Sequence, residues 1–175
     1  MSSESITTAL FLITAVIASA VLISAVFPVI QTMAGTFSSS THESDVRIRT
    51  DFKIIATFAS SSEAPGIARV WMKNIGSEKI PLLQIQKADV FCGAVGNYDH
   101  LTYHHVEPDE LANLSNGQWT EDFGAAYDLN SNSYWDSGET LKVTAKTAIP
   151  STGNNVYFQF ALSNGVWRSN EFTAS

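Results

Sequence analysis

The run ITTALFLITAVIASAVLISAVFPVI, residues Ile6–Ile30, decides how this chain is organised. It is mostly apolar and contains no charged side chain. At roughly 1.5 Å rise per residue, a helix of this length crosses a hydrocarbon core of about 30 Å. We therefore predict a membrane-length helix. Its few polar side chains are hydroxyls that can bond back to helix carbonyls, namely Thr7, Thr8, Thr14, Ser19 and Ser24.

Three interpretations of this helix compete. A cleaved secretory signal is disfavoured, because the chain begins MSSES without Lys or Arg and the apolar core is long. A plain membrane anchor through Ile6–Ile30 is the simplest interpretation. The third is a helix that also packs against copies of itself or partner helices. Small residues four positions apart permit such close approach, and the sequence offers Ala15 with Ser19 and Ala20 with Ser24.

Downstream of the helix the hydrophobic period changes to two. In Asn155–Leu162 and Thr140–Thr147, apolar and polar residues alternate, which is typical of strands with one buried face. We predict a mainly β fold in which a long N-terminal hydrophobic α-helix precedes an immunoglobulin-like β-sandwich. The helix occupies residues 1–34, a linker or helix extension 35–49, and the β-sandwich domain 50–175.

Five further strands are expected between turn signals rich in Gly, Pro and Asn. The closing turn Asn164-Gly165 leads into Val166-Trp167-Arg168, so the chain is expected to end in a hairpin. No long helical pattern interrupts the strands, which makes a parallel α/β fold improbable. The further strands are Asp51–Phe58, Ile67–Asn74, Leu82–Phe91, Leu101–His105 and Gln118–Phe123.

Composition excludes several functions. The 175 residues contain 10 Lys plus Arg against 17 Asp plus Glu, a net charge of −7. A nucleic-acid binder needs a basic face for phosphates, so we expect none. The single Cys92 rules out an intramolecular disulfide. Neither GxSxG, HExxH nor a phosphate-binding glycine loop is present, and we expect no enzyme activity.

The most specific local motif is DLNSNSYWDSGE, which matches the spacing of a twelve-residue calcium loop. Calcium prefers six to eight hard oxygen ligands, which alternate residues of such a loop supply. Ser133 stands where the motif carries Gly, and a simple polar turn is the competing interpretation. We expect a Ca²⁺ site whose ligands, in loop order, are Asp128, Asn130, Asn132, Tyr134 through its carbonyl, Asp136 and Glu139.

Acidic residues and histidines gather in the same half of the chain. From Asp89 to Glu139 there is no Lys or Arg. This stretch is either a solvated acidic face or a surface that recruits cations or a basic partner. His100, His104 and His105 lie close in sequence, but without a third ligand at a fixed spacing they are better explained as surface histidines than as a transition-metal site.

Three segments resemble the accessory, stator-type proteins of the archaellum, the archaeal flagellum, that form the F and G family. They are Ser2–Ala9 (SSESITTA) before the apolar run, Arg49–Ile55 (RTDFKII), and Val70–Ser77 (VWMKNIGS) with its Lys-Asn-x-Gly-Ser turn. The Ser-Ser-x-x-Ile-Thr start is similar to the G-type branch. The resemblance does not extend over the acidic region from about Asp99 to Asp136.

This resemblance implies a non-catalytic structural component of the archaeal motility machine. Its β-sandwich would lie outside the cytoplasmic membrane in the cell envelope and bind the surface layer or other archaellum proteins. Archaellins and archaeal type IV pilins share this plan, so a self-assembling filament subunit that packs through its N-terminal helix is the alternative. Archaellins begin with a short basic leader, and none stands before this helix. A calcium-dependent adhesion or carbohydrate-binding module on a membrane stalk is a third hypothesis.

Overall fold

The computed structural model describes residues 2–62, 65–124 and 126–175. The chain divides into two compact units, with the boundary between Ser44 and Asp45. Each unit is described by itself below. The first unit is helical, and the second contains the strands.

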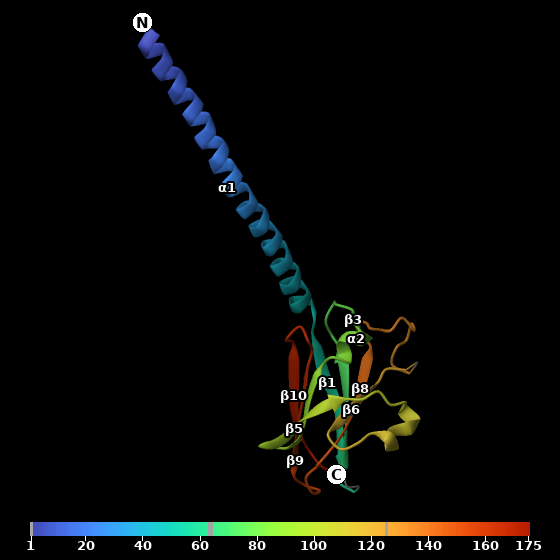
Figure 1. Ribbon diagram of the computed structural model, residues 1–175. Coiled ribbons are helices and arrows are strands. Elements are labelled where there is room, and N and C mark those ends of the chain that lie inside the picture. Colours follow the sequence, from blue (N-terminus) through green and yellow to red (C-terminus); the bar gives the residue numbers. More distant parts are fainter. Residues whose placement is uncertain (1, 63–64, 125) are drawn as a thin grey trace. The chain divides into compact units, whose positions relative to one another are not determined.

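The helix α1 runs from Ser2 to Arg49 and includes Pro28 without ending there (Figure 1). Residues 35–49 are therefore helical, and the stretch GTFSSSTHESD is not a linker. Polar residues in this stretch bond back along the helix, as Ser39 Oγ does to the Gly35 carbonyl at 3.1 Å. These internal bonds pair the hydroxyls without interrupting the helix, so a segment with a loop-like composition is compatible with it.

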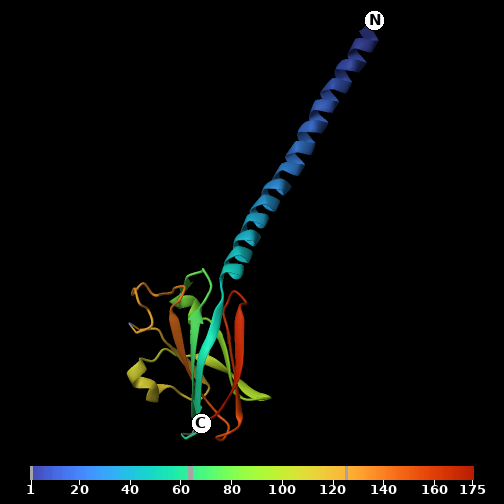
Figure 2. The same ribbon diagram turned by 180° about the vertical axis from the view of Figure 1, so that it is seen from behind.

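The second unit is a β domain built from one long sheet that folds over on itself (Figures 1 and 2). The strand order is β1-β2-β8-β6-β5-β4-β9-β10. The first four strands are β1 (Phe52–Ser60), β2 (Gly66–Asn74), β8 (Thr140–Thr147) and β6 (Gln118–Asp122). The last four are β5 (Asn97–Tyr103), β4 (Asp89–Ala94), β9 (Asn155–Ala161) and β10 (Trp167–Thr173).

The two halves join through a short parallel pairing of β5 with β6, at Thr102↔Gln118 and Tyr103↔Trp119. All other pairings in this sheet are antiparallel. The outer strands β1 and β10 also contact each other. The expected mainly β, sandwich-like domain that follows a long helix is thus confirmed.

Three smaller elements complete the β domain. They are a two-stranded sheet of β3 (Ile80–Pro81) with β7 (Tyr134–Trp135), the short helix α2 (Leu82–Ile85), and the 3₁₀ segment η1 (Pro108–Asn113).

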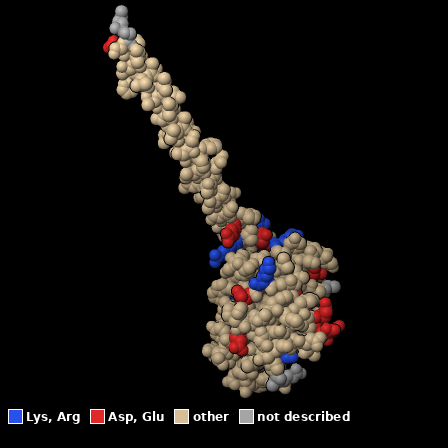
Figure 3. Space-filling view, viewed as in Figure 1, with Lys and Arg blue, Asp and Glu red and all other residues tan. Residues whose placement is uncertain are grey.

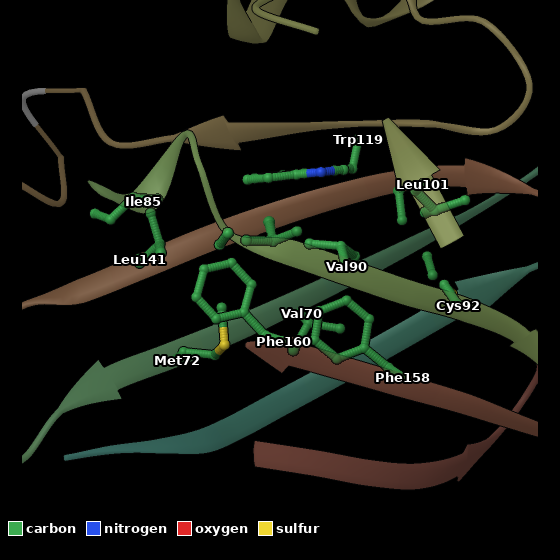
Figure 4. Packing of buried hydrophobic residues seen from close by; sticks show 14 of the residues in the cluster. Val70, Met72, Ile85, Val90, Cys92, Leu101, Trp119, Leu141, Phe158 and Phe160 are labelled. Atoms are coloured by element: carbon green, nitrogen blue, oxygen red, sulfur yellow. The ribbon is translucent and has the colours of Figure 1, made fainter. Parts of the chain in front are cut away.

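The core lies between the two halves of the sheet (Figure 4). Val70 and Met72 face inward from β2, and Phe158 and Phe160 face inward from β9. The alternation predicted for Thr140–Thr147 and Asn155–Leu162 matches this burial. Each apolar Å² removed from water contributes roughly 25 cal/mol, so burial of these alternating residues stabilises the sandwich.

One expected strand is wrong and another is shifted. Leu82–Phe91 was expected to be a single strand, but it divides into α2 and β4. Pro81 precedes the first helical residue with φ −66°, a conformation suited to starting a helical turn. The strand expected at Leu101–His105 lies earlier in the chain, where β5 begins at Asn97 and ends at Tyr103. The C-terminal hairpin is confirmed by the antiparallel pairing of β9 with β10.

The Lys-Asn-x-Gly-Ser turn after β2 is fixed by a buried asparagine. Asn74 donates from Nδ2 to the carbonyls of Glu78 at 2.9 Å and Trp135 at 2.8 Å, and its Oδ1 accepts from Gly76 N at 3.0 Å. A Cβ on Gly76 would overlap the Arg49 carbonyl oxygen. Only glycine therefore fits where this turn approaches the start of the β domain.

Candidate functional surfaces

The surface of α1 is the most unusual feature of the chain. Every side chain from residue 3 to residue 44 is exposed, including large apolar ones such as Phe11, Ile17 and Phe37. No Asp, Glu, Lys or Arg occurs between Glu4 and Glu43, and the face of the helix seen in Figure 3 carries none between its first turn and its last turns. By length and composition this helix can cross a membrane. A helix that is apolar all round is stable only when surrounded by apolar material.

Hydroxyl side chains of α1 donate hydrogen bonds to carbonyls of the same helix. The expected hydroxyl bonds form as predicted, with Thr7 Oγ1 donating to the Ser3 carbonyl and Thr8 Oγ1 to the Glu4 carbonyl, both at 2.9 Å. Thr14 Oγ1 donates in the same way to the Leu10 carbonyl. Because these hydroxyls need no water, entry into an apolar environment leaves none of them unpaired.

The two pairs of small residues behave alike but lie on different sides of the helix. Ser19 Oγ donates to the Ala15 carbonyl at 2.7 Å, and Ser24 Oγ donates to the Ala20 carbonyl at 2.8 Å. At about 100° of rotation per residue, Ala15 and Ala20 are separated by about 140° around the axis. One partner helix reaches only one pair, whereas neighbours on two sides reach both.

The expected calcium loop is compact, and its acidic residues are buried. Asp128, Asp136 and Glu139 are less than one tenth exposed. Asp128 accepts from Asn132 N at 3.2 Å and Ser133 N at 2.9 Å. Ser133 has φ 62°, the left-handed conformation for which the motif uses Gly.

The carboxylates of this loop already have partners within the protein. Asp136 Oδ2 accepts from Asn130 Nδ2 at 2.7 Å and from Asn132 Nδ2 at 2.8 Å, and Lys79 Nζ lies 3.1 Å from Oδ1. The amide hydrogen bonds, with the Lys79 charge, hold the pKa of the Asp136 carboxyl below its usual value. Glu139 accepts from Leu129 N and Asp136 N.

These contacts bear on the calcium prediction in opposite ways. The oxygen-rich donor set suits Ca²⁺. However, the amide nitrogens of Asn130 and Asn132, not their oxygens, face Asp136. Tyr134 lies in β7, and its N donates to Asn132 Oδ1 at 2.8 Å, so this amide oxygen is already hydrogen-bonded within the loop. Among residues 2–62, 65–124 and 126–175, no three His, Cys, Asp or Glu side chains form a metal-ready group. The calcium site stays a prediction.

His100 and His105 contact different carboxylates in the structure. His100 lies in β5, stacks on Phe91 with ring centroids 4.8 Å apart, and places Nε2 3.0 Å from Asp89 Oδ1. His105 lies beyond the strand, with Nδ1 3.4 Å from Glu121 Oε1 and Nε2 3.5 Å from Glu107 Oε1. His100 therefore pairs with Asp89, whereas His105 lies between Glu107 and Glu121.

A small pocket next to His105 was missed by sequence reasoning. Its volume is about 180 Å³. We call it the Glu121 pocket, because the carboxyl of Glu121 forms its buried polar wall. The residues come from α2, the loop after β5, and β6, so no spacing in the sequence marks them. Its lining includes Leu82, Val106, Glu107, Pro108, Glu121 and Phe123.

Cys92 is not placed for nucleophilic chemistry. It is fully buried in the core of the β domain. Burial raises the pKa of its thiol to about 12, so it stays protonated at neutral pH. A thiol in this state is a packing residue.

Comparison with known proteins adds family information to this geometry. The model of the archaeal-type flagellin family matches residues 2–172. A protein from Archaeoglobus fulgidus, described as uncharacterized, is 25% identical over 174 residues, which is 98% of each chain. The archaellum periplasmic stator protein FlaG from Sulfolobus acidocaldarius is similar in structure, with a TM-score of 0.51 and 18% identity, over 70% of this chain and 99% of that one. The archaeal flagellum of Methanospirillum hungatei strain JF1 is similar with a TM-score of 0.53 and 16% identity, over 91% of this chain and 90% of that one.

Proposed function

Since the chain belongs to the archaeal-type flagellin family, we propose that it is a non-catalytic structural subunit of the archaellum whose copies associate through their N-terminal helices. The expected relation to archaellum proteins is confirmed at the level of this family. Such a protein belongs to the cell envelope or to a surface filament.

The observation that carries the proposal is the exposed, apolar surface of α1. Residues 3–44 are exposed on all sides, and the hydroxyls along the helix bond internally. Water is an unfavourable solvent for such a surface, at roughly 25 cal/mol for each apolar Å². A lipid bilayer or a bundle of like helices removes it from water. The small-residue pairs on two sides of the helix support the bundle.

In detail, we propose the stator role. The helix spans the cytoplasmic membrane through Ile6–Ile30, and the β domain lies outside, where it contacts the surface layer or other archaellum proteins. The shared fold with the stator protein FlaG supports this assignment. So does the Asn74 turn within Lys-Asn-x-Gly-Ser, one of the segments that resemble the stator-type F and G family.

A filament subunit is the second candidate, and one observation favours it. The likeness to the assembled Methanospirillum flagellum covers 91% of the chain. The β domain, residues 45–175, makes up only about three quarters of the 175 residues, so this likeness includes part of α1. In this role the helix forms part of a filament core.

Gold labelling of whole cells separates the two roles. An antibody against the β domain, visualised by electron microscopy, is expected to mark the base of the archaellum and the cell envelope if the chain acts as a stator. Label along the length of the extracellular filament would overturn the stator role and establish the filament role. A strain that lacks the gene provides the background control.

A further inference from the structure

The Glu121 pocket contains a buried carboxylate whose hydrogen bonds are unequal. Glu121 is 4% exposed. Its Oε1 accepts from Tyr103 Oη and Gln86 Nε2, both at 2.9 Å. Its Oε2 is buried and receives no hydrogen bond from the part of the chain that the structure describes. A buried carboxylate oxygen without a donor is unfavourable, so this oxygen favours a ligand that donates.

The charges around the pocket favour a cation as that ligand. Glu107 lines the opening, and Asp122, also in the lining, is paired with Lys142 Nζ at 2.6 Å. His105 faces both Glu107 and Glu121. No Lys or Arg lies between Asp89 and Glu139. The negative charge of Glu107 and Glu121 is therefore left without a Lys or Arg partner in the described residues.

The other walls of the pocket suit an alkyl chain. Leu82, Val106, Pro108 and Phe123 are apolar and line the same pocket as the carboxylates. The volume of about 180 Å³ is close to that of a cavity of about 150 Å³ that holds a benzene ring. The space fits one side chain. Lys and Arg combine an apolar stem with a cationic, donating head, which matches both parts of the lining.

We propose that the Glu121 pocket binds a Lys or Arg side chain from a second copy of this chain. The choice of a second copy rests on the proposed function, in which copies associate through α1. The side-chain head contacts the carboxyl of Glu121, and its stem lies against Leu82 and Val106. The contact joins the β domains of neighbouring subunits.

A matching donor surface lies on the first two strands. Lys53 of β1 and Lys73 of β2 are directly opposite each other, and both are exposed. Like charges opposite each other on a sheet are destabilising. In the described residues neither lysine has an ion-pair partner. A carboxylate from a neighbouring subunit would relieve this repulsion.

The geometry of such a contact has a consequence for assembly. The donor strands β1 and β2 and the acceptor pocket are different surfaces of one β domain. A contact between two different patches is heterologous, and it generates a ring or an open helical array instead of a symmetric dimer. This agrees with a subunit whose helices also pack with neighbours on more than one side.

The pocket is tested with n-butylammonium chloride as a mimic of a lysine side chain. The full chain, in a non-ionic detergent, is titrated while NMR follows the methyl signals of Leu82 and Val106. We expect saturable shifts that require at least tenfold more probe in Glu121→Gln and are unchanged in Glu171→Gln, a matched charge removal on β10. Equal titration of the wild type and Glu121→Gln would overturn the pocket as a cation site.

The occupant is tested by zero-length carbodiimide cross-linking of a mixture of ¹⁵N-labelled and unlabelled full chains. We expect isotopically mixed products that join Lys53 or Lys73 to Glu107 or Glu121, and their loss in Lys53→Gln/Lys73→Gln. Probe binding without these products would overturn the second copy as occupant. If the wild-type chains assemble but do not bind n-butylammonium, the inference about the Glu121 pocket is overturned, whereas the proposed function remains intact.

Discussion

Ser19 donates its hydroxyl to the carbonyl of Ala15 at 2.7 Å, so the two small residues on this side of α1 present no unpaired polar group. The hydroxyl is turned onto its own helix, which leaves a shallow, dry surface for a neighbouring backbone. In an apolar environment, close packing at such a surface contributes much of the association energy of helices. The size of the side chain at position 15 should therefore control how strongly the α1 helices of neighbouring copies associate.

The first prediction is that Ala15→Leu weakens association of the full chain at least tenfold, about 1.4 kcal/mol. The leucine side chain holds the neighbouring backbone away while leaving the helix and the Ser19 hydrogen bond intact. Sedimentation in detergent at several protein concentrations measures this. Ile17→Leu, a change of shape at constant volume on the same helix, is the control. Equal weakening by both substitutions would mean that Ala15 has no special place in the contact.

The second prediction concerns the apolar character of the run. Val16→Arg places a charge near its middle, which costs about 2.5–3.5 kcal/mol in a bilayer. We expect this variant to lose both membrane association and assembly, whereas Ser40→Arg, in the polar end of α1, retains them. Flotation with liposomes provides the measurement. A Val16→Arg chain that floats like the wild type would show that the helix is not surrounded by apolar material.

The third prediction tests the turn after β2. Asn74→Ala removes hydrogen bonds to the carbonyls of Glu78 and Trp135 and leaves both without this donor. At about 1–3 kcal/mol for each buried unpaired group, we expect a loss of about 3 kcal/mol in the free energy of unfolding. Asn116→Ala, in an exposed turn, should change it by less than about 0.5 kcal/mol. Thermal unfolding followed by circular dichroism compares the two variants. A loss of stability in Asn74→Ala as small as that in Asn116→Ala would contradict this role of Asn74.

Periodicity predicted the regular parts of the fold well. In β8 and β9 every second residue enters the core, and the alternation in the sequence reports this directly. The apolar run and its hydroxyl bonds were equally predictable, because both depend only on local helix geometry. The Leu82–Phe91 strand was wrong because the short segment LLQI, Leu82–Ile85, is compatible with a helix or a strand, and it forms a helical turn directly after Pro81.

Features that depend on distant segments were not predictable. β7 is only Tyr134–Trp135, and it exists because Ile80–Pro81 pairs with it. The Glu121 pocket brings α2 next to β6 and the loop after β5, and no sequence spacing encodes this. The extent of α1 through Arg49 was left open, because Gly, Ser and Thr in residues 35–45 are compatible both with a linker and with a helix whose hydroxyls bond back to its carbonyls.

The fourth prediction is that Ca²⁺ stabilises the chain through the loop Asp128–Glu139. Binding at a hundredfold excess over Kd adds about 2.7 kcal/mol to the free energy of unfolding. Lys79→Met should strengthen binding, because Lys79 Nζ lies 3.1 Å from Asp136 Oδ1 and competes with the ion. Calorimetry with and without calcium tests this, with Glu110→Gln as the control. No calcium effect in the wild type, or the same effect in Asp128→Ala, would reduce the loop to a polar turn.

The fifth prediction follows from the buried thiol of Cys92. Burial raises its pKa from an ordinary 9.0 to about 12 in the folded chain. Above pH 9 the unfolded thiol ionises while the folded one keeps its proton, so stability falls as pH rises from about 9 to about 12, by up to about 1.4 kcal/mol per pH unit. In Cys92→Ala, this part of the decrease in the free energy of unfolding with rising pH should be absent. Urea unfolding at pH 8, 9 and 10 measures the difference between the two chains, and parallel profiles would contradict it.

Electron microscopy of the purified full chain after detergent removal tests the central claim most directly. Val16→Arg and a chain without residues 1–42 are examined beside it. We predict ordered multi-copy assemblies of the full chain with helices packed together, and dispersed particles for both variants. Single, separate copies of the full chain under the same conditions, indistinguishable from the variants, would contradict association through the N-terminal helix.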